Sequence, residues 1–386
     1  MRQLLGTAFA ATWIATISWA DVPRVATDIA PIHGLVSQVM KDLGEPDLII
    51  RPGASPHSYA LRPSEARALS QADLVVWIGE GLAPWLEPSI EQLATNAHVL
   101  ELLAQPSTTI LPYREGATFE AHDHDEHDAH DDHGHDDDHK DHEGHDEHSE
   151  HAHDEHNHDE HAKHNEEHES HDAHPEHDEH AHDEHHQDEH AHDEHHQDEH
   201  ADHDKKHDDH HGHDHSAGDP HVWLSPENAI TWLSVIAEEL SELDPENASK
   251  YQKNAQEGIA KIQQTKADLA PQLSNIADKS FVVFHDAYQY FEVSFGVTAA
   301  GAISLGDASD PSPARIAEVR DTVRDLNVAC AFREPQYNSG LVDTVLEGTE
   351  ARALILDPLG TNLELGSNFY PELLQEMGKT LIACLK

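Results

Sequence analysis

The sequence predicts an α/β protein in which two Rossmann-like lobes are joined by one long helix. Residues 21–120 alternate short apolar runs with amphipathic stretches, and residues 278–386 repeat this alternation. Between them, residues 245–277 place apolar side chains at helical spacing. Alternating strands and helices are typical of a parallel sheet covered by helices. The central helix is longer than most globular helices, so we expect it to link the two lobes.

We assign residues 21–244 to the first, N-terminal lobe, which begins with three strand–helix units. Each expected strand is short and apolar, and each expected helix has apolar positions three or four residues apart. The expected strands are RVATD (24–28), DLIIR (47–51) and DLVVWIG (73–79), and the expected helices are HGLVSQVMKDLG (33–44), SEARALSQA (64–72) and WLEPSIEQLA (85–94).

The first lobe closes with a strong helix pattern in SPENAITWLSVIAEELSEL (225–243). Ser225 can cap this helix through its hydroxyl, and Pro226 suits the first helical turn. The second lobe, residues 278–386, repeats the strand–helix alternation of the first. Its expected strands are SFVVFH (280–285), VACAF (328–332) and RALILD (352–357), and its expected helices cover residues 313–327, 340–348 and 369–385.

Residues 1–20 have the pattern of a cleavable signal peptide. Arg2 precedes an apolar stretch, and the small residues Ser18 and Ala20 suit cleavage before Asp21. The apolar stretch is too short and too poorly flanked for a membrane-spanning helix, although an uncleaved anchor is the alternative. We therefore expect a soluble, exported mature chain with no stable membrane insertion.

A run of His, Asp and Glu extends from His122 to His215 in the first lobe. It holds 35 of the 40 histidines, carries about −34 of the net charge of −53, and repeats the unit AHDEHHQDEH at 181–190 and 191–200. Such a segment buries too little apolar surface to offset its ordering entropy, so we expect a disordered loop at 120–218. Its negative charge argues against nucleic acid as a partner, and imidazole beside carboxylate favours metal cations.

Four residues outside the run form a candidate metal site. His57 follows the second expected strand, His285 and Asp357 each close a strand of the second lobe, and His221 lies just before the capped helix. Ligands of open α/β sheets bind beyond the carboxyl ends of strands, so these side chains are in suitable places. Three imidazoles and one oxygen suit zinc, while copper, iron and nickel also accept imidazole.

Five segments match, in order, the motifs of one protein family: GASPHSYALRPSEARAL, DPHVWLSPENA, FHDAYQYFE, FREPQYNSGLV and LDPLGTNLELG. Through them the chain resembles the periplasmic zinc-binding proteins of ABC importers. The resemblance implies two lobes with the metal between them, and His57, His221 and His285 as Zn²⁺ ligands. It also implies a periplasmic, non-enzymatic monomer that delivers Zn²⁺ to an inner-membrane permease and its ATPase. Zinc-type members similarly carry an acidic, His-rich insertion before the second ligand.

The fourth ligand is left open by a departure from the family pattern. Several relatives have Glu before the first ligand His, where this chain has Pro56. The fourth position then falls to Asp357, to water or to nothing. Manganese-type relatives use two His and two carboxylates, with an Asp that matches Asp357, so a carrier of manganese is one alternative. Because the first three positions are all His, we favour zinc.

A zinc-dependent hydrolase is the other alternative, because three His and an open position also occur in catalytic zinc sites. The sequence contains neither HExxH nor GxSxG, so we expect no enzyme. We expect Asp286 to cap a helix, with a hydrogen bond to the neighbouring His285 as the alternative, and Glu334 to lie near the cleft or in an ion pair. We expect His33 to lie at the surface, with a position facing the cleft as the alternative, and His98 to have no role in the site.

The two cysteines, Cys330 and Cys384, are expected to pair. An exported protein meets an oxidising compartment, which favours a disulfide over two unpaired buried thiols. The family resemblance implies the same pairing.

We interpret the run as a low-affinity element that captures or senses zinc, with a solvated spacer as the alternative. Ordering a loop around one ion costs entropy, which favours several weak sites. Imidazole titrates near pH 6.5 and loses its metal when protonated, so zinc binding by the run should fade below about pH 6. Titration calorimetry of the mature chain at pH 7 and pH 5 measures this, and undiminished multi-site binding at pH 5 would contradict it.

Overall fold

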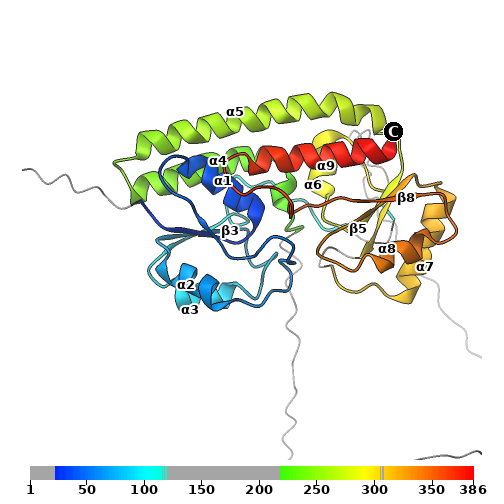
Figure 1. Ribbon diagram of the computed structural model, residues 1–386, viewed down its shortest axis with the longest axis horizontal. Helices are drawn as coiled ribbons and strands as arrows, with labels where there is room; N and C mark the ends of the chain where they lie inside the picture. The colour runs from blue at the N-terminus through cyan, green and yellow to red at the C-terminus, as the bar shows by residue number, and fades with distance from the viewer. Residues whose placement is uncertain (1–21, 115, 117, 120–217, 305, 307) are drawn as a thin grey trace, which may run out of the picture. The chain divides into compact units, whose positions relative to one another are not determined.

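The computed structural model describes residues 22–114, 116, 118–119, 218–304, 306 and 308–386 (Figure 1). The expected signal peptide and the run from His122 to His215 lie outside the described residues. Among the residues that are described, no helix has the length and apolar character needed to cross a membrane.

Two parallel four-stranded sheets form the frame of the fold, one around β3 and one around β5 (Figure 1). The two sheets share one strand order. In each, the first strand lies between the second and the third, so the order reverses beside the first strand. Ligands of such sheets bind at this reversal, beyond the carboxyl ends of the strands. The sheets are β2-β1-β3-β4, with β1 (Val25–Thr27), β2 (Asp47–Leu48), β3 (Leu74–Trp77) and β4 (His98–Glu101), and β6-β5-β7-β8, with β5 (Phe281–His285), β6 (Gly301–Ser304), β7 (Cys330–Arg333) and β8 (Arg352–Ile355).

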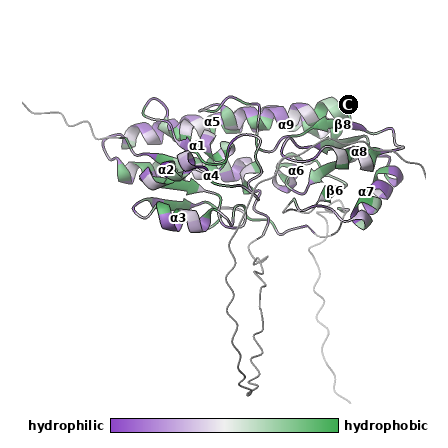
Figure 2. Ribbon diagram, turned by 60° about the horizontal axis from the view of Figure 1, so that its bottom comes forward, coloured by the Kyte–Doolittle hydropathy of each residue, from purple (hydrophilic) through white to green (hydrophobic). Residues whose placement is uncertain are grey.

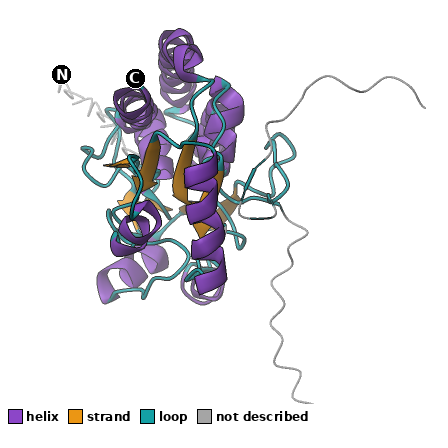
Figure 3. Cartoon of the chain, turned by 90° about the vertical axis from the view of Figure 1, so that its right-hand side faces the viewer, coloured by secondary structure: helices purple, strands orange, loops and turns teal. Residues whose placement is uncertain are grey.

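Helices lie on both sides of the strands (Figure 3). The strands are mainly hydrophobic, whereas the helices carry both hydrophilic and hydrophobic positions (Figure 2). This difference is expected, since a parallel strand is covered on two faces and a surface helix on one. The helices of the first half are α1 (Ala30–Met40), α2 (Pro63–Gln71), α3 (Glu87–Leu93) and α4 (Pro226–Leu243), and those of the second are α6 (Gln289–Phe295), α7 (Pro313–Asp325), α8 (Gly340–Leu346) and α9 (Phe369–Leu385).

The α/β fold class and most of the expected elements are confirmed, with differences at their ends. Helix α1 begins three residues before its expected start, because Pro31 occupies its first turn. Strand β2 stops at Leu48, although the amide groups of Ile49 and Ile50 still donate to the carbonyl oxygens of the neighbouring strand end. Strands β4 and β6 and helix α6 were not expected. The predicted cap of α4 is present, since the Ser225 hydroxyl accepts a hydrogen bond from the Asn228 amide.

The long helix α5 (Ala248–Leu273) links the two halves and is followed by the short 3₁₀ turn η3 (Ser274–Ile276). It contacts α1, α4 and α9. A Cβ atom at Gly258 would lie 2.6 Å from the Gln38 side chain, so this glycine permits close packing of α5 on α1. The Gln38 amide donates to the Asn254 carbonyl oxygen at 2.7 Å. Helix α9 of the second half also contacts α1 of the first half. This packing is a second connection between the halves, in addition to α5.

The chain that leads into the run contacts the second half before it leaves the described residues. The Leu111 amide donates to the Tyr290 hydroxyl at 2.9 Å, and the Phe119 amide donates to the Ala300 carbonyl oxygen at 3.0 Å. Residues 109–119, which the sequence places in the first lobe, therefore connect the two halves.

Arg114 in this segment lies buried between two carboxylates of the second half. Its guanidinium forms ion pairs with Asp286 and with Glu292, and all three side chains are at most 8% exposed. The prediction that Asp286 caps a helix is wrong, because α6 begins only at Gln289 and has no side-chain cap. The carboxylate of Asp286 instead neutralises a buried cation.

A disulfide joins Cys330 on β7 to Cys384 on α9, with a Cα–Cα distance of 6.1 Å and a sequence separation of 54. It attaches the C-terminal helix to the second sheet.

Replacing both cysteines with alanine should lower the free energy of unfolding by about 4 kcal/mol, because the cross-link no longer restricts the unfolded chain. Urea denaturation of the oxidised wild type and of the Cys330→Ala/Cys384→Ala variant measures the difference. Reduced wild type serves as the control and should match the variant. Equal stability of the oxidised wild type and the variant would contradict the prediction.

Candidate metal centre

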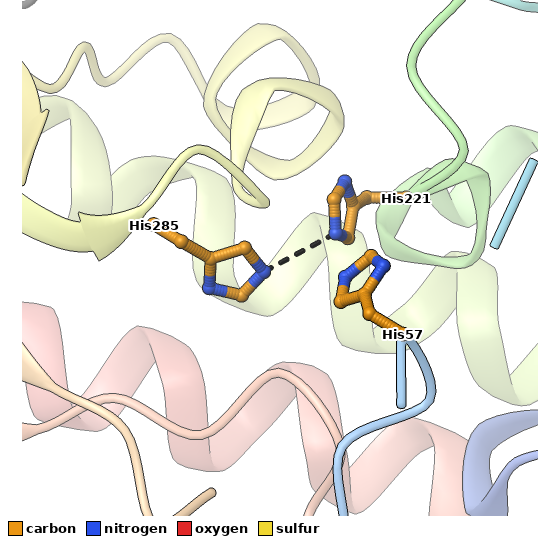
Figure 4. A group of neighbouring side chains, drawn as sticks. All are labelled: His57, His221 and His285. Carbon is orange, nitrogen blue, oxygen red and sulfur yellow. Dashed lines mark hydrogen bonds between the residues drawn. The ribbon is translucent and has the colours of Figure 1, made fainter. Parts of the chain in front are cut away.

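Three histidines from distant parts of the chain meet at one point (Figure 4). His57 lies in the loop after β2, His221 directly precedes the 3₁₀ turn η2 (Val222–Leu224), and His285 ends β5. Each offers one ring nitrogen, and these nitrogens all lie within 4.8 Å of one another. The structure therefore brings together the three histidines that the sequence singles out.

The spacing of two of these nitrogens fits a zinc ion. The Nε2 atoms of His221 and His285 face each other at 3.2 Å (Figure 4). Two nitrogens bound tetrahedrally at the usual Zn–N distance lie about 3.4 Å apart. The third ring, His57, stands edge-on to both, with centroids 5.4 Å from His221 and 5.8 Å from His285.

Two buried carboxylates orient the rings. The Nδ1 atom of His221 lies 2.7 Å from Asp219 Oδ1, and the Nδ1 atom of His285 lies 2.7 Å from Glu334 Oε1. An ionised carboxylate only accepts hydrogen bonds, so each Nδ1 carries the proton and each Nε2 keeps its lone pair for a metal. The same oxygens also accept from the backbone amides of the two histidines.

Burial sets the protonation states on the His221 side. It lowers the pKa of His221 well below its ordinary value, and the nearby His285 acts in the same direction. The ring is therefore neutral at neutral pH, which is the form that binds metals. Burial also raises the pKa of Asp219 to about 7, against the hydrogen bond from the His221 amide. A dication in the site favours the ionised form of Asp219, so metal binding and loss of this proton are coupled.

The three rings border a small cavity of about 10 Å³. This volume is enough for one water molecule or one metal ion. Much of the remaining wall is apolar and comes from Pro56, Trp223, Pro358 and Leu359. An ion in this cavity is shielded from bulk water, which strengthens its attraction to the ligand nitrogens.

The structure does not place Asp357 in this group. Its Oδ1 accepts hydrogen bonds from Gln336 Nε2 at 3.1 Å and from the Leu359 amide at 3.0 Å, and its Oδ2 accepts from the Thr361 amide at 2.6 Å. These bonds favour a role in shaping the loop that carries Pro358 and Leu359. Asp357 as a direct ligand stays a prediction.

The remaining expectations have different outcomes. The expectation for Glu334 is confirmed, because it borders the cavity and its carboxylate is the partner of His285. Asp219 was not singled out, although a carboxylate two residues before a ligand His was a usable signal. His33 is buried rather than at the surface, and its ring contacts the Pro46 carbonyl oxygen at 3.1 Å. His98 is exposed and lies outside the group of three histidines.

The two sheets and the tri-histidine centre define a two-lobed metal-binding protein. Residues 25–384 match the family described as zinc-uptake complex component A, periplasmic (ZnuA). The chain is 40% identical to the high-affinity zinc uptake system protein ZnuA of Paracoccus denitrificans, over 95% of this chain and 93% of that protein. It is 37% identical to the protein of the same description from Brucella abortus, over 99% and 97%. The chain therefore belongs to the ZnuA family.

Solved structures show the same fold at lower identity. A crystal structure of ZnuA matches with a TM-score of 0.62 and 16% identity, over 95% of this chain and all of that chain. A zinc-bound mutant variant of AdcAII from Streptococcus pneumoniae matches with a TM-score of 0.61 and 21% identity, over 95% and 99%.

Removing the charge of either orienting carboxylate should weaken zinc binding roughly 10- to 100-fold, because the ring then loses both its fixed tautomer and basicity. The variants are Asp219→Asn and Glu334→Gln, and competition with a chelator measures their affinity. Glu376→Gln, at an exposed position on α9, is the control and should bind like the wild type. Affinities of the two site variants within about twofold of the wild type would contradict this assignment.

Proposed function

We propose that this protein captures Zn²⁺ in the periplasm and delivers it to an inner-membrane ABC permease with its ATPase. The observation that carries the proposal is the convergence of His57, His221 and His285, whose ligand nitrogens lie within 4.8 Å of one another. Membership of the ZnuA family supports it, as does the description of its relatives as high-affinity zinc uptake proteins.

Zinc fits the donor set better than manganese does. Three imidazole nitrogens suit zinc, whereas manganese prefers sites with more oxygen ligands. The side chain before His57 is Pro56, which has no oxygen to offer. We propose His57, His221 and His285 as the zinc ligands, with the fourth position filled by water or by Asp357.

The cavity supports carriage rather than hydrolysis. A volume of about 10 Å³ is the room that one ion or one water molecule needs. The carboxylates beside the rings, Asp219 and Glu334, already accept hydrogen bonds from the Nδ1 atoms of the ligand rings. A hydrolase needs a general base and a substrate pocket at the open position of its zinc.

The way in which Zn²⁺ is released follows from the two halves that supply its ligands. His57 and His221 belong to segments of the first half, and His285 ends β5 in the second. We propose that the permease separates the halves, which removes at least one nitrogen from the ion. The protein acts as a monomer in this scheme, since one chain supplies all three nitrogens.

The His-rich run is proposed as an accessory that raises the zinc supply near the cavity. The run ends at His215, six residues before His221 in the sequence. Its composition suits many weak sites, whereas the cavity suits one strong site.

A zinc titration of the mature protein without residues 122–215 tests the proposal. In competition with a tight chelator, one tight site per chain should remain. It should be lost in His57→Ala, His221→Ala and His285→Ala, because each change removes one of three nitrogens. His98→Ala is the control, since this exposed histidine lies outside the group.

The same protein should restore growth of a transporter-deficient strain under zinc limitation. Absence of a tight site in the shortened chain would overturn the proposal and make the run the metal centre.

A further inference from the structure

The loop that carries His57 is a partly exposed part of the cavity wall. His221 and His285 are 1% and 3% exposed, whereas His57 is only partly buried. The residues on both sides of His57, from 51 to 61, are mostly exposed or partly buried. This loop therefore moves with less loss of packing than the buried segments that carry His221 and His285.

A hydrogen bond links this loop to the second half. The Ser55 hydroxyl lies 3.0 Å from the Tyr337 hydroxyl, and Ser55 stands two residues before His57. Tyr337 follows β7 and borders the cavity. Its ring stacks on Phe284 at a centroid distance of 4.9 Å and stands edge-on to His285 at 5.4 Å. These two ring contacts hold Tyr337 against the second half, next to the proposed ligand His285.

The first half holds the same loop by a different bond. The Trp85 indole donates to the Pro56 carbonyl oxygen at 2.8 Å, and both residues belong to the first half. When the halves separate, this bond can persist while the bond from Ser55 to Tyr337 must break. Separation of the halves therefore breaks the hydrogen bond at Ser55 but leaves the hydrogen bond at Pro56 in place.

We propose that the hydrogen bond between Ser55 and Tyr337 is a latch that holds the His57 loop over the cavity and slows the escape of Zn²⁺. The inference rests on the proposed function, since it assigns a positioning role to two residues that need not touch the ion. Movement of this partly exposed loop opens the cavity at His57, whereas His221 and His285 lie on buried segments. The latch restrains that movement.

The test uses the full mature chain loaded with one equivalent of Zn²⁺, in the forms Tyr337→Phe, Ser55→Ala and the double variant. Mixing with excess chelator gives the dissociation rate. Each single variant should release Zn²⁺ roughly 2- to 12-fold faster, the factor expected for one net hydrogen bond. The double variant should release it no faster than the singles, because all three lose the same bond. Phenylalanine keeps the ring contacts with Phe284 and His285.

A control and a metal-free measurement separate this latch from a general loss of stability. Tyr251→Phe removes a hydroxyl on α5 that donates to Asp244 at 2.9 Å, away from the residues that border the cavity, and should leave the dissociation rate unchanged. Without zinc, amide hydrogen exchange in residues 51–61 should be faster in both latch variants than in the wild type.

Wild-type dissociation rates in both single variants, or effects that multiply in the double variant, would overturn the latch while leaving zinc binding intact. If the wild type fails to bind zinc, the proposed function falls. Faster exchange of residues 51–61 would then still show that the bond closes the loop.

Discussion

The metal centre depends on two buried carboxylates that accept hydrogen bonds from the Nδ1 atoms of its two most buried histidine rings. Asp219 and Glu334 fix the tautomers of His221 and His285 and so direct two Nε2 lone pairs into one cavity. Facing lone pairs repel each other in a dry site, and a cation between them removes this repulsion. The same oxygens hold the histidine backbones, so ring orientation and chain path are set together.

The shared strand order shows why the site lies where it does. In the second sheet, His285 ends β5 and Glu334 follows β7, so the reversal of strand order carries a ligand and its partner. In the first sheet, Asp28 lies at the matching reversal of strand order, and its carboxylate accepts hydrogen bonds from the backbone amides of Ile29 and Ile78 at 2.7 Å. The side chain at this reversal therefore stabilises the ends of the strands, whereas the side chains at the reversal of the second sheet form part of the metal centre.

The sequence predicted the fold class, the long helix and the meeting of three histidines, because each leaves a local pattern. Apolar periodicity marks α4 and α5, and few histidines lie outside the run. Contacts between distant residues left no such pattern: Arg114 and Asp286 are 172 residues apart. Nor does spacing show that His33 is buried or which carboxylate meets which ring. Short strands such as β4 and β6 depend on pairing with a neighbour, which periodicity does not reveal.

Arg114 restricts how the two halves can move. Pulling residues 109–119 off the second half would leave Asp286 and Glu292 as buried charges without their cation, which is costly. This segment therefore acts as a tether beside the covalent connection through α5. Two bodies joined at separate points are less free to twist or slide than two bodies joined at one, because each attachment removes directions of movement. Any separation of the halves must therefore either keep the Arg114 ion pairs or bear the cost of breaking them.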